Sequence, residues 1–336
     1  MESILLLVHT EPDGSLGKAA LEGLTAALAL AGDLSVGLVG AGVQPGANQI
    51  AGAGAKRILA VTGDAFGQPR YSTDAAAAEA LCRASGAALV LAPSTSRWAR
   101  ALPGVAYRLG GRVDTHATEL ALRNGVPAVT RWFYRQRMEA VLTRSSRPWV
   151  VLLDSGCVPA WSGEAGVAVV EPVGVEMPAT RTTVTGTRSP EAGEQTIRPD
   201  AKLLFVAGAG WTKKQPDGAV HSADAEKLIL GFLHATQASL GGSKSLVDLS
   251  GEGEAVLRFM THMNQIGQTG ATPRHPKGLS TCCHGEEPHA VGWRFIGERR
   301  AINLDPNCGW ARGKADVLYV ADAFEVMGHV NRLLQG

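Results

Sequence analysis

The stretch "KLLFVAGAG", Lys202 to Gly210, is a short apolar run that ends in a glycine-rich turn sequence. A continuous apolar run of this length is typical of a strand buried on both faces, and the closely spaced glycines are typical of a tight turn. Strands buried on both faces belong to parallel sheets that helices cover. The stretch therefore predicts an α/β fold for this part of the chain.

The residues that follow continue the alternation of helix and strand. We expect a helix from about Ser222 to Ser239, with acidic residues at its positive end and with Gly241 and Gly242 stopping it. The segments "RRAINLDP" and "ADVLYVAD", each with an apolar strand pattern, and a final helix from Ala323 to Leu334 complete a second, small α/β unit.

The first half of the chain alternates in the same way. "ILLLVH", an amphipathic segment from Leu16 to Ala31 and "LSVGLVGAG" predict strand, helix and strand. "RILAVTG", a helix from about Thr73 to Ser85, "AALVLAP" and a helix from Arg97 to Leu109 extend the parallel sheet. From Asp114 to Asp154 the pattern changes to short strands, "AVTRWFY", "MEAVLTR" and "WVVLLD", separated by polar turns. This change predicts an antiparallel edge.

The two halves are joined by a segment without apolar periodicity. Residues 174–199 are rich in Thr, Pro, Gly and charged side chains, as a linker is. We place the boundary near Thr196. The expected domains are residues 1–195, which include most of the linker, and residues 196–336.

Composition excludes several classes of protein. The chain has 336 residues and a formal net charge of +1, so it builds no strong field to attract nucleic acid. No apolar stretch is long enough to span a bilayer. Five cysteines, an odd number, favour a reducing cytoplasm over a disulfide-bonded secreted protein. We expect a cytoplasmic protein without nucleic acid or an integral membrane segment.

Polar and glycine residues follow the predicted strands of the second half. In a parallel sheet the carboxyl ends of the strands lie along one edge, where ligands bind in open α/β folds. The sequence therefore predicts one ligand site there, although the glycine turn lacks the full G-x-G-x-x-G spacing of a dinucleotide fold. Its candidate residues are Gly208, Gly210, Ser243, Lys244, Gln268, Thr269, Asn303, Asp305 and Asp322.

The second half also resembles a known family. "RPDAKLLFVAGAG", "GGSKSLVD", "QIGQTGATP", "PHAVG", "RRAINLDP" and "KADVLYVADAFEVM" occur in the order of the electron transfer flavoprotein alpha subunit. "LVLAPSTSRWARALPGVAYRLGGRVDT" in the first half is similar to that family's first-domain motif. The resemblance implies that the second domain is a doubly wound, DHS-like FAD-binding domain.

The family's roles can be carried onto matching positions. The resemblance implies that Ser243 and Lys244 approach the flavin, and that Gln268, Thr269 and Gly270 of the motif "QIGQTG" touch the flavin ring and ribityl chain. It implies that His289 lies near the pyrimidine edge of the ring, and that Asn303 and either Asp322 or Asp316 hold the adenosine end. The cofactor-binding residues of the motif are Gln265, Gly267, Gln268, Thr269 and Gly270.

The same resemblance implies an electron carrier rather than an enzyme with its own substrate. Such a subunit pairs with a beta subunit, receives electrons from a flavin-dependent dehydrogenase and passes them to a quinone oxidoreductase or another acceptor. The flavin domain would move about the linker. The sequence does not name the donor, nor does it show whether the beta subunit holds AMP or a second FAD.

Two departures from the family pattern bear on the site. The glycine turn has Ala209 where the family has arginine, and Lys244 replaces the arginine of a Ser-Arg pair, which keeps the charge but loses the planar guanidinium. The neighbouring Cys282, Cys283 and His284 are potential ligands of zinc or another soft metal. Adjacent cysteines lack the usual two-residue spacing, so we expect a loop beside the flavin and no metal.

Two other functions stay open at this point. One is a nicotinamide- or flavin-dependent oxidoreductase subunit with its substrate in the first domain, for which Arg112, Asp114 and His116 are the only candidate cluster. The other is a flavin-free nucleotide-binding module that holds a partner.

Overall fold

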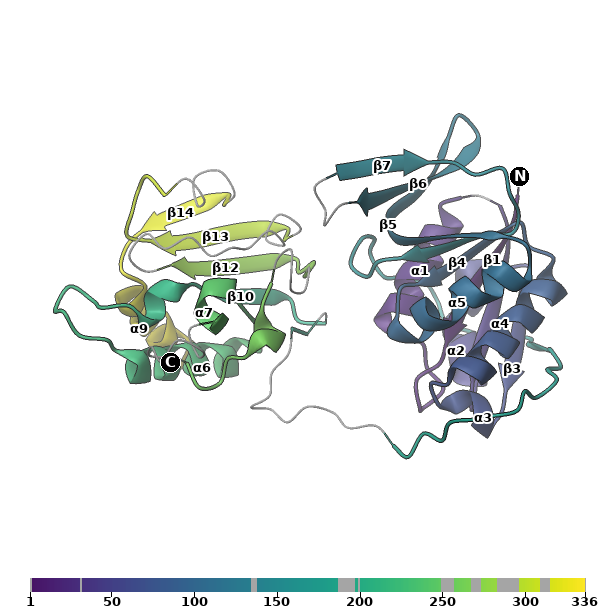
Figure 1. Ribbon diagram of the computed structural model, residues 1–336, viewed down its shortest axis with the longest axis horizontal. Helices are drawn as coiled ribbons and strands as arrows, with labels where there is room; N and C mark the ends of the chain where they lie inside the picture. The colour runs from purple at the N-terminus through teal and green to yellow at the C-terminus, as the bar shows by residue number, and fades with distance from the viewer. Residues whose placement is uncertain are drawn as a thin grey trace. The chain divides into compact units, whose positions relative to one another are not determined.

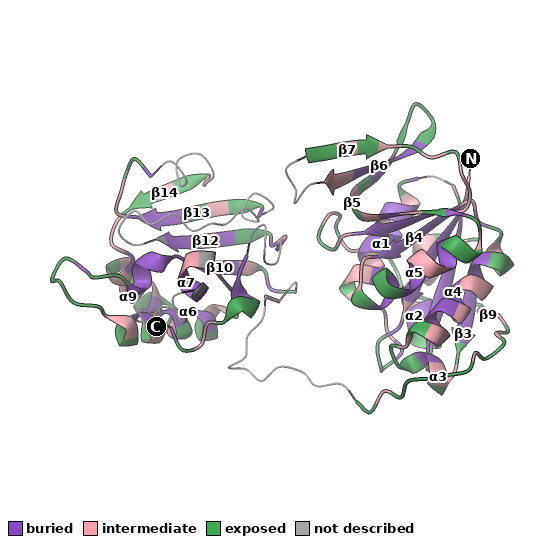
Figure 2. Cartoon of the chain, viewed as in Figure 1, coloured by how far each residue is buried: buried purple, intermediate pink, exposed green. Residues whose placement is uncertain are grey.

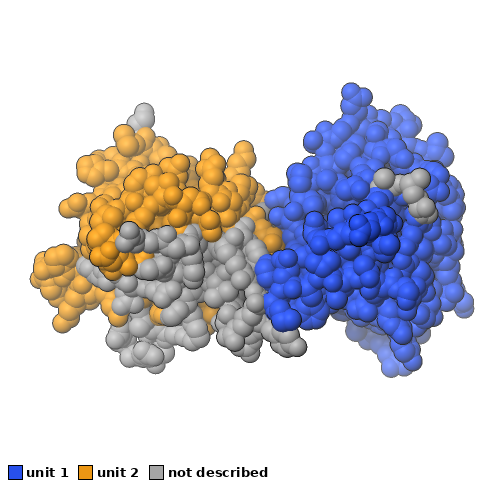
Figure 3. Space-filling model, turned by 90° about the horizontal axis from the view of Figure 1, so that it is seen from above, with its two compact units in different colours: residues 1–186 blue, residues 187–336 orange. Residues whose placement is uncertain are grey.

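The chain forms two compact units, which are described separately. The computed structural model describes residues 2–30, 32–133, 138–186, 197–198, 200–248, 257–266, 273–282, 296–308 and 315–335, with only the backbone at positions 244, 248 and 282. Contacts between Cα atoms divide the chain into Met1–Gly186 and Thr187–Gly336 (Figure 3). The division lies inside the segment expected as a linker, nine residues before the expected boundary.

The first unit contains a nine-stranded sheet in the order β7-β6-β5-β8-β4-β1-β2-β3-β9 (Figure 1). The strands are β1 (Ser3–His9), β2 (Asp33–Gly40), β3 (Arg57–Thr62), β4 (Leu89–Pro93), β5 (Arg112–Arg123), β6 (Val126–Phe133), β7 (Met138–Leu142), β8 (Trp149–Leu153) and β9 (Glu171–Pro172). The helices are α1 (Lys18–Leu28), α2 (Gln44–Gln49), α3 (Asp64–Gly67), α4 (Tyr71–Ser85) and α5 (Ser96–Arg108), with a 3₁₀ turn, η1, at Ala51–Ala53.

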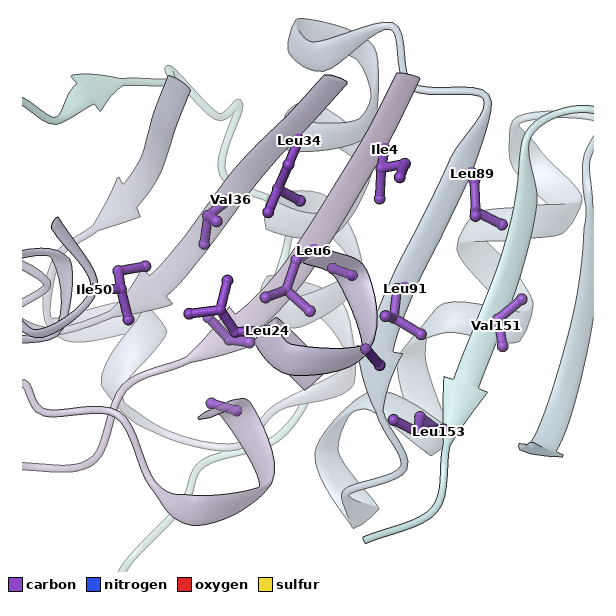
Figure 4. Close-up of a cluster of buried hydrophobic side chains, with 14 of the residues drawn as sticks. Ile4, Leu6, Leu24, Leu34, Val36, Ile50, Leu89, Leu91, Val151 and Leu153 are labelled. Atoms are coloured by element: carbon purple, nitrogen blue, oxygen red, sulfur yellow. The ribbon is translucent and has the colours of Figure 1, made fainter. Parts of the chain in front are cut away.

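Helices cover both faces of this sheet. Ile4 and Leu6 of β1 pack with Leu24 of α1 on one face, as Figure 4 shows, whereas Leu5 and Leu7 pack with α4 and α5 on the other. Successive side chains of a strand point to opposite faces, so an unbroken apolar run is what a doubly covered strand requires. Figure 2 shows the buried residues concentrated in these strands.

The antiparallel edge is present but smaller than expected. β5 pairs antiparallel with β6, and β6 with β7. β8 was expected at this edge, but it lies between β4 and β5 and is parallel to both. Its side chains from Trp149 to Leu153 are all buried, as in the interior of a parallel sheet.

The second unit contains a five-stranded, all-parallel sheet in the order β11-β10-β12-β13-β14. Its strands are β10 (Leu203–Ala207), β11 (Ser239–Gly242), β12 (Lys277–Cys282), β13 (Glu298–Asn303) and β14 (Val317–Val320). The helices are α6 (Ser222–Thr236), α7 (Lys244–Asp248) and α9 (Ala323–Gln335), with 3₁₀ turns η2 (Ala209–Thr212) and η4 (His262–Asn264). The fold class is thus the α/β arrangement expected from the sequence.

Phe205 of β10 marks the face of this sheet that α6 and α9 cover. It packs against Phe232 of α6, with 5.4 Å between ring centroids, and Met327 of α9 belongs to the same buried cluster. Leu204 and Val206 point to the opposite face and pack with Ile266 and Ala301. β10 is therefore buried on both faces, as its apolar run predicts.

Two expectations for this unit were wrong. α6 ends at Thr236, and Gly241 and Gly242 lie in β11 instead of ending the helix. A Cβ on Gly242 would lie 2.3 Å from Met260 Cε, the end of a flexible side chain that would have to shift. The second error concerns Lys277–Cys282, which fall in a stretch expected as a loop but form β12, paired with β10 and β13.

Candidate functional site

The strand registers of the second unit bring five strand ends to one edge. Ala207 is level with Gly242 and Thr281, and Asn303 is level with Cys282 and Val320. The residues that follow these strands therefore lie along the carboxyl edge of the sheet, where open α/β folds bind ligands. Among the predicted residues, this edge brings together Gly208, Gly210, Ser243, Lys244, Gln265, Asn303, Asp305 and Asp322.

The glycine turn follows β10 directly. The Gly208 N–H donates to the Thr281 carbonyl at 2.8 Å, and Ala209 is 3 % exposed. The turn leads into η2, and α6 begins at Ser222, where the sequence predicted a helix to begin. Contact with a ligand at Gly208–Gly210 therefore depends on the main chain, since the turn carries no polar side chain.

Ser243 and Gln265 lie beside the glycine turn. The Ser243 N–H donates to the Ala207 carbonyl at 3.1 Å, and its buried Oγ accepts from Leu246 N at 3.2 Å, which caps α7. Gln265 is 7 % exposed and forms a parallel bridge with Gly242. Lys244 is the first residue of α7.

The side-chain amide of Asn303 is buried, and only its oxygen has a hydrogen-bond partner in the described part of the chain. The residue is 1 % exposed, and its Oδ1 accepts from Asp305 N at 2.9 Å. Its Nδ2 is buried and has no hydrogen-bond partner among the residues that the structure describes. Because buried polar groups in native proteins are nearly always paired, this donor is the feature of the edge that best fits a bound polar ligand. Asp305 itself accepts from Asn307 N at 2.8 Å.

The structure separates the two aspartates proposed for the adenosine end. Asp322 follows β14 and caps α9, because its Oδ1 accepts from Phe324 N at 2.7 Å. Asp316 precedes β14 and lies at the opposite end of the strands, where it accepts from Arg299 Nη2 at 2.9 Å. Hydrogen bonds from the Arg299 side chain and backbone hold the pKa of Asp316 below its usual range. Only Asp322 belongs to the edge that carries Asn303.

Thr281 and Trp211 also lie beside the glycine turn, and the sequence did not predict either residue there. Thr281 lies near the carboxyl end of β12, a strand that was not predicted from the sequence. Trp211 lies in η2 and was not distinguished from the other tryptophans. The signal that could have found Trp211 is its position, one residue after the glycine turn.

Several predicted positions lie outside the described residues. These are Gly267, Gln268, Thr269, Gly270 and His289, together with Cys283 and His284. In the ranges that the structure describes, no group of three or more His, Cys, Asp or Glu residues is placed to hold a metal ion. Within those ranges, no helix combines the length and apolar character that a membrane span needs.

In the cluster of the first unit that was nominated as an enzyme site, both carboxylate oxygens of Asp114 already accept hydrogen bonds. Asp114 is 1 % exposed and accepts from Arg131 Nη1 at 3.1 Å, from Arg144 Nη2 at 2.8 Å and from Trp149 Nε1 at 2.9 Å. Burial alone would raise the pKa of Asp114, but the hydrogen bonds from Arg144 and Trp149 outweigh it and lower that pKa. With both oxygens occupied, this carboxylate serves to join β5, β6 and β8.

The other members of that cluster point elsewhere. Arg112 Nη1 donates to the carbonyl of Gly111 at 2.9 Å. His116 has φ 56° at an irregularity of β5, and its Nδ1 lies 3.4 Å from Asp154 Oδ1. The hydrogen bond to Asp154 raises the pKa of His116. The three residues therefore do not form one acid–base site.

A small cavity lies at the carboxyl ends of the neighbouring strands β1 and β4. At this point the strand order reverses, because β2 and β3 lie on one side of β1 and β4 lies on the other. The volume of the cavity is about 80 Å³, and His9, Glu11, Lys18 and Thr95 line it. Burial, followed by the charge of Arg97, lowers the pKa of His9 to about 4, so the imidazole is neutral at physiological pH. Sites for small molecules typically measure roughly 300–1,000 Å³, so this cavity is small for a substrate.

Comparison with known proteins adds distant relatives. The chain is 25 % identical over 254 residues to Protein FixB of Salmonella typhimurium (strain LT2), and equally to Protein FixB of Salmonella typhi, over 75 % of this chain and 75 % of each relative. The glycosyltransferase SnogD from Streptomyces nogalater aligns over 99 % of this chain and 95 % of its own, with 13 % identity and a TM-score of 0.26, too low to support an argument. The family model for the electron transfer flavoprotein domain matches residues 4–199, more than half of the chain, so the chain belongs to that family.

Proposed function

We propose that the chain is the alpha subunit of a heterodimeric electron transfer flavoprotein, with FAD bound at the carboxyl edge of the second unit. It would pair with a beta subunit, accept electrons from a flavin-dependent dehydrogenase and deliver them to a quinone oxidoreductase or a similar acceptor. Membership of the electron transfer flavoprotein domain family supports an electron-transfer role. The flavin motifs lie outside residues 4–199, which the family model matches. The proposal that the chain binds FAD is therefore supported by these motifs and by the geometry of the carboxyl edge.

The buried Nδ2 of Asn303 is the observation that carries this proposal. Within the described part of the chain it is a hydrogen-bond donor without a partner. It lies at the end of β13, an interior strand, and in a motif, "AINLDP", that resembles the family's adenosine-binding segment. Leaving such a donor unpaired costs roughly 1–3 kcal/mol, which a ligand acceptor would recover. Asp322 and the glycine turn lie on the same edge of the sheet.

FAD, when bound, supplies the one- and two-electron chemistry that amino-acid side chains lack. The protein's part is to bind and orient it. The main chain of Gly208–Gly210 permits close approach, Ser243 and Lys244 begin a short helix beside it, and Asn303 offers the free amide.

The oxidoreductase alternative finds less support. Its nominated carboxylate, Asp114, is fully engaged by two arginines and a tryptophan. The flavin-free nucleotide module differs from the carrier in one observable property, the bound flavin.

An anaerobic reductive titration of the full chain purified with its beta subunit tests the proposal. Flavin and metal are counted on the same sample, and the visible spectrum is followed. One FAD per alpha chain, reducible without any turnover of NADH alone, is the expected result. A colourless complex that still binds nucleotide would establish the module instead, and NADH turnover would establish the oxidoreductase.

A further inference from the structure

Trp211 and Thr281 form a buried hydrogen bond behind the glycine turn. Both side chains are 0 % exposed, and Trp211 Nε1 donates to Thr281 Oγ1 at 2.7 Å. A buried indole N–H usually finds a partner, and here the partner comes from a strand 70 residues further along the chain. The bond therefore ties η2 to the carboxyl end of β12.

Thr281 also holds the beginning of the turn. Its carbonyl accepts from Gly208 N at 2.8 Å, and its Oγ1 donates to the Val206 carbonyl at 3.1 Å. The hydroxyl thus donates to β10 and accepts from Trp211, which uses its donor and one acceptor position. A single residue at the end of β12 fixes both ends of Gly208–Gly210, the first through its carbonyl and the second through Trp211.

The indole ring extends this connection to a second loop of the edge. It packs edge-on against Phe324, with 4.7 Å between ring centroids. Phe324 lies in the first turn of α9, and its N–H is held by Asp322. Movement of Trp211 would therefore shift the glycine turn relative to Asp322.

We infer that the hydrogen bond between Trp211 and Thr281 positions the glycine turn for FAD. The inference rests on the proposed function. In this chain Ala209 stands at the centre of the turn, with no side-chain cation to attract a ligand. Binding by main-chain groups alone depends on accurate placement, because a glycine-containing segment otherwise samples many conformations. Trp211 and Thr281 are positioning residues, and the bond between them supplies that placement.

The test uses Trp211→Phe, which keeps an aromatic ring, and Thr281→Val, which keeps the shape but removes the hydroxyl. The full chain is purified with its beta subunit, and two quantities are measured: the dissociation constant for FAD and the unfolding temperature of the flavin-free protein. Each variant is expected to weaken FAD binding by about three- to tenfold, the worth of one buried hydrogen bond. The double variant is expected to be no more than about twofold weaker than the worse single variant, because both changes remove the same bond. Thr281→Ser, which keeps the hydroxyl, is expected to bind like the wild type.

Matched controls come from the first unit. Trp98 is also 0 % exposed, and no described residue is a hydrogen-bond partner of its Nε1; Thr73 is likewise 0 % exposed. Trp98→Phe and Thr73→Val are expected to leave FAD affinity unchanged. These controls separate an effect on the glycine turn from the general effect of altering a buried tryptophan or threonine.

Two results would overturn the inference while leaving the proposed function intact. The first is a wild type that binds FAD and positioning variants that bind it within about twofold of the wild type. The second is a loss of affinity that follows the unfolding temperature and that Thr281→Ser does not restore, which would show a structural role only. A wild-type complex without FAD would overturn the proposed function itself, and the inference with it.

Discussion

Arg97 and Asp74 form a buried ion pair that joins α5 to α4. Arg97 Nη2 lies 2.7 Å from Asp74 Oδ1, with 6 % and 0 % of the two residues exposed, and the same guanidinium donates to the Phe66 carbonyl. Removing one partner of a buried pair leaves an uncompensated charge. We predict that Arg97→Met lowers the free energy of unfolding by about 3–5 kcal/mol, measured by urea denaturation of the full chain.

The surface pair of Arg83 with Glu79 is the matched control for this prediction. Arg83 Nη2 lies 2.7 Å from Glu79 Oε1, but the arginine side chain is 61 % exposed. Arg83→Met is expected to cost less than about 1 kcal/mol. Combining Arg97→Met with Asp74→Leu should recover most of the loss. A large loss in the double variant would mean that packing around the pair matters more than its charges.

Asp114 gives the second prediction. Asp114→Asn keeps the shape of the side chain but leaves Arg131 and Arg144 without a negative partner, so the first unit is expected to be destabilised. The lowered pKa of Asp114 means that its contribution is present above the unfolded-state pKa and is lost as pH falls through the folded-state pKa. The stability difference between wild type and variant, measured by urea unfolding, should therefore shrink at acidic pH.

The same variant separates a structural role for Asp114 from a catalytic one. FAD content and electron transfer are expected to be unchanged at temperatures where Asp114→Asn is folded. His116→Ala is expected to leave both properties unchanged as well, since His116 contacts Asp154 at a partly exposed site. A folded Asp114→Asn variant that retains FAD but loses transfer would revive the oxidoreductase alternative.

The sequence predicted those parts of the fold in which a local residue pattern is compatible with a single structure. The unbroken apolar runs of β1 and β10 indicate strands buried on both faces, and both lie in the interior of their sheets. β8 has an equally apolar run, but its direction depends on the path of the chain between α5 and β8, which local pattern does not encode. The β12 segment "KGLSTC" has a single large apolar residue, and its strand conformation comes from pairing on both sides.

The candidate site was predicted through a topological rule, because polar residues after parallel strands must share an edge. The rule correctly brings Gly208, Ser243, Asn303 and Asp322 together. The rule selected Asp322 alone; the choice between Asp316 and Asp322 that the family resemblance left open was decided only by the ends of β14. Trp211 escaped because a tryptophan's burial says nothing about its indole N–H, whose partner Thr281 lies in a strand that was not foreseen.

His221 gives a prediction about pH. Its Nε2 lies 2.7 Å from Asp217 Oδ2 and its Nδ1 3.6 Å from Asp224, and the hydrogen bond with Asp217 raises the pKa of His221. A group whose pKa is raised by folding stabilises the fold below its unfolded-state pKa, and this contribution is lost as pH rises through the folded-state pKa. The bridge between Lys214 and Val220 is therefore expected to open more readily at about pH 8.5 than at about pH 5.5.

Amide hydrogen exchange of this loop, corrected for the intrinsic effect of pH, measures the opening. The difference should disappear in His221→Gln, and Asp217→Asn should lower the pKa of His221 in an NMR titration. An unchanged difference in His221→Gln would assign the effect to another group. At the acidic limit the loop should loosen again, because the pKa of Asp217 is lowered by the Ala219 N–H and by His221, and protonation removes both interactions.

Asn303 provides the last prediction, since its unpaired amide separates cofactor binding from stability. In Asn303→Leu the buried Nδ2 disappears, which removes an unsatisfied donor and offsets the loss of the hydrogen bond to Asp305 N. FAD affinity is expected to fall at least about tenfold, with little change in the unfolding temperature of the flavin-free protein. Asn331 of α9 is the control residue, because its amide is also half bonded: Nδ2 donates to the Leu228 carbonyl at 2.8 Å, and Oδ1 has no partner among the described residues. Asn331→Leu should leave FAD affinity unchanged; an unchanged FAD affinity in Asn303→Leu would place the ligand away from Asn303.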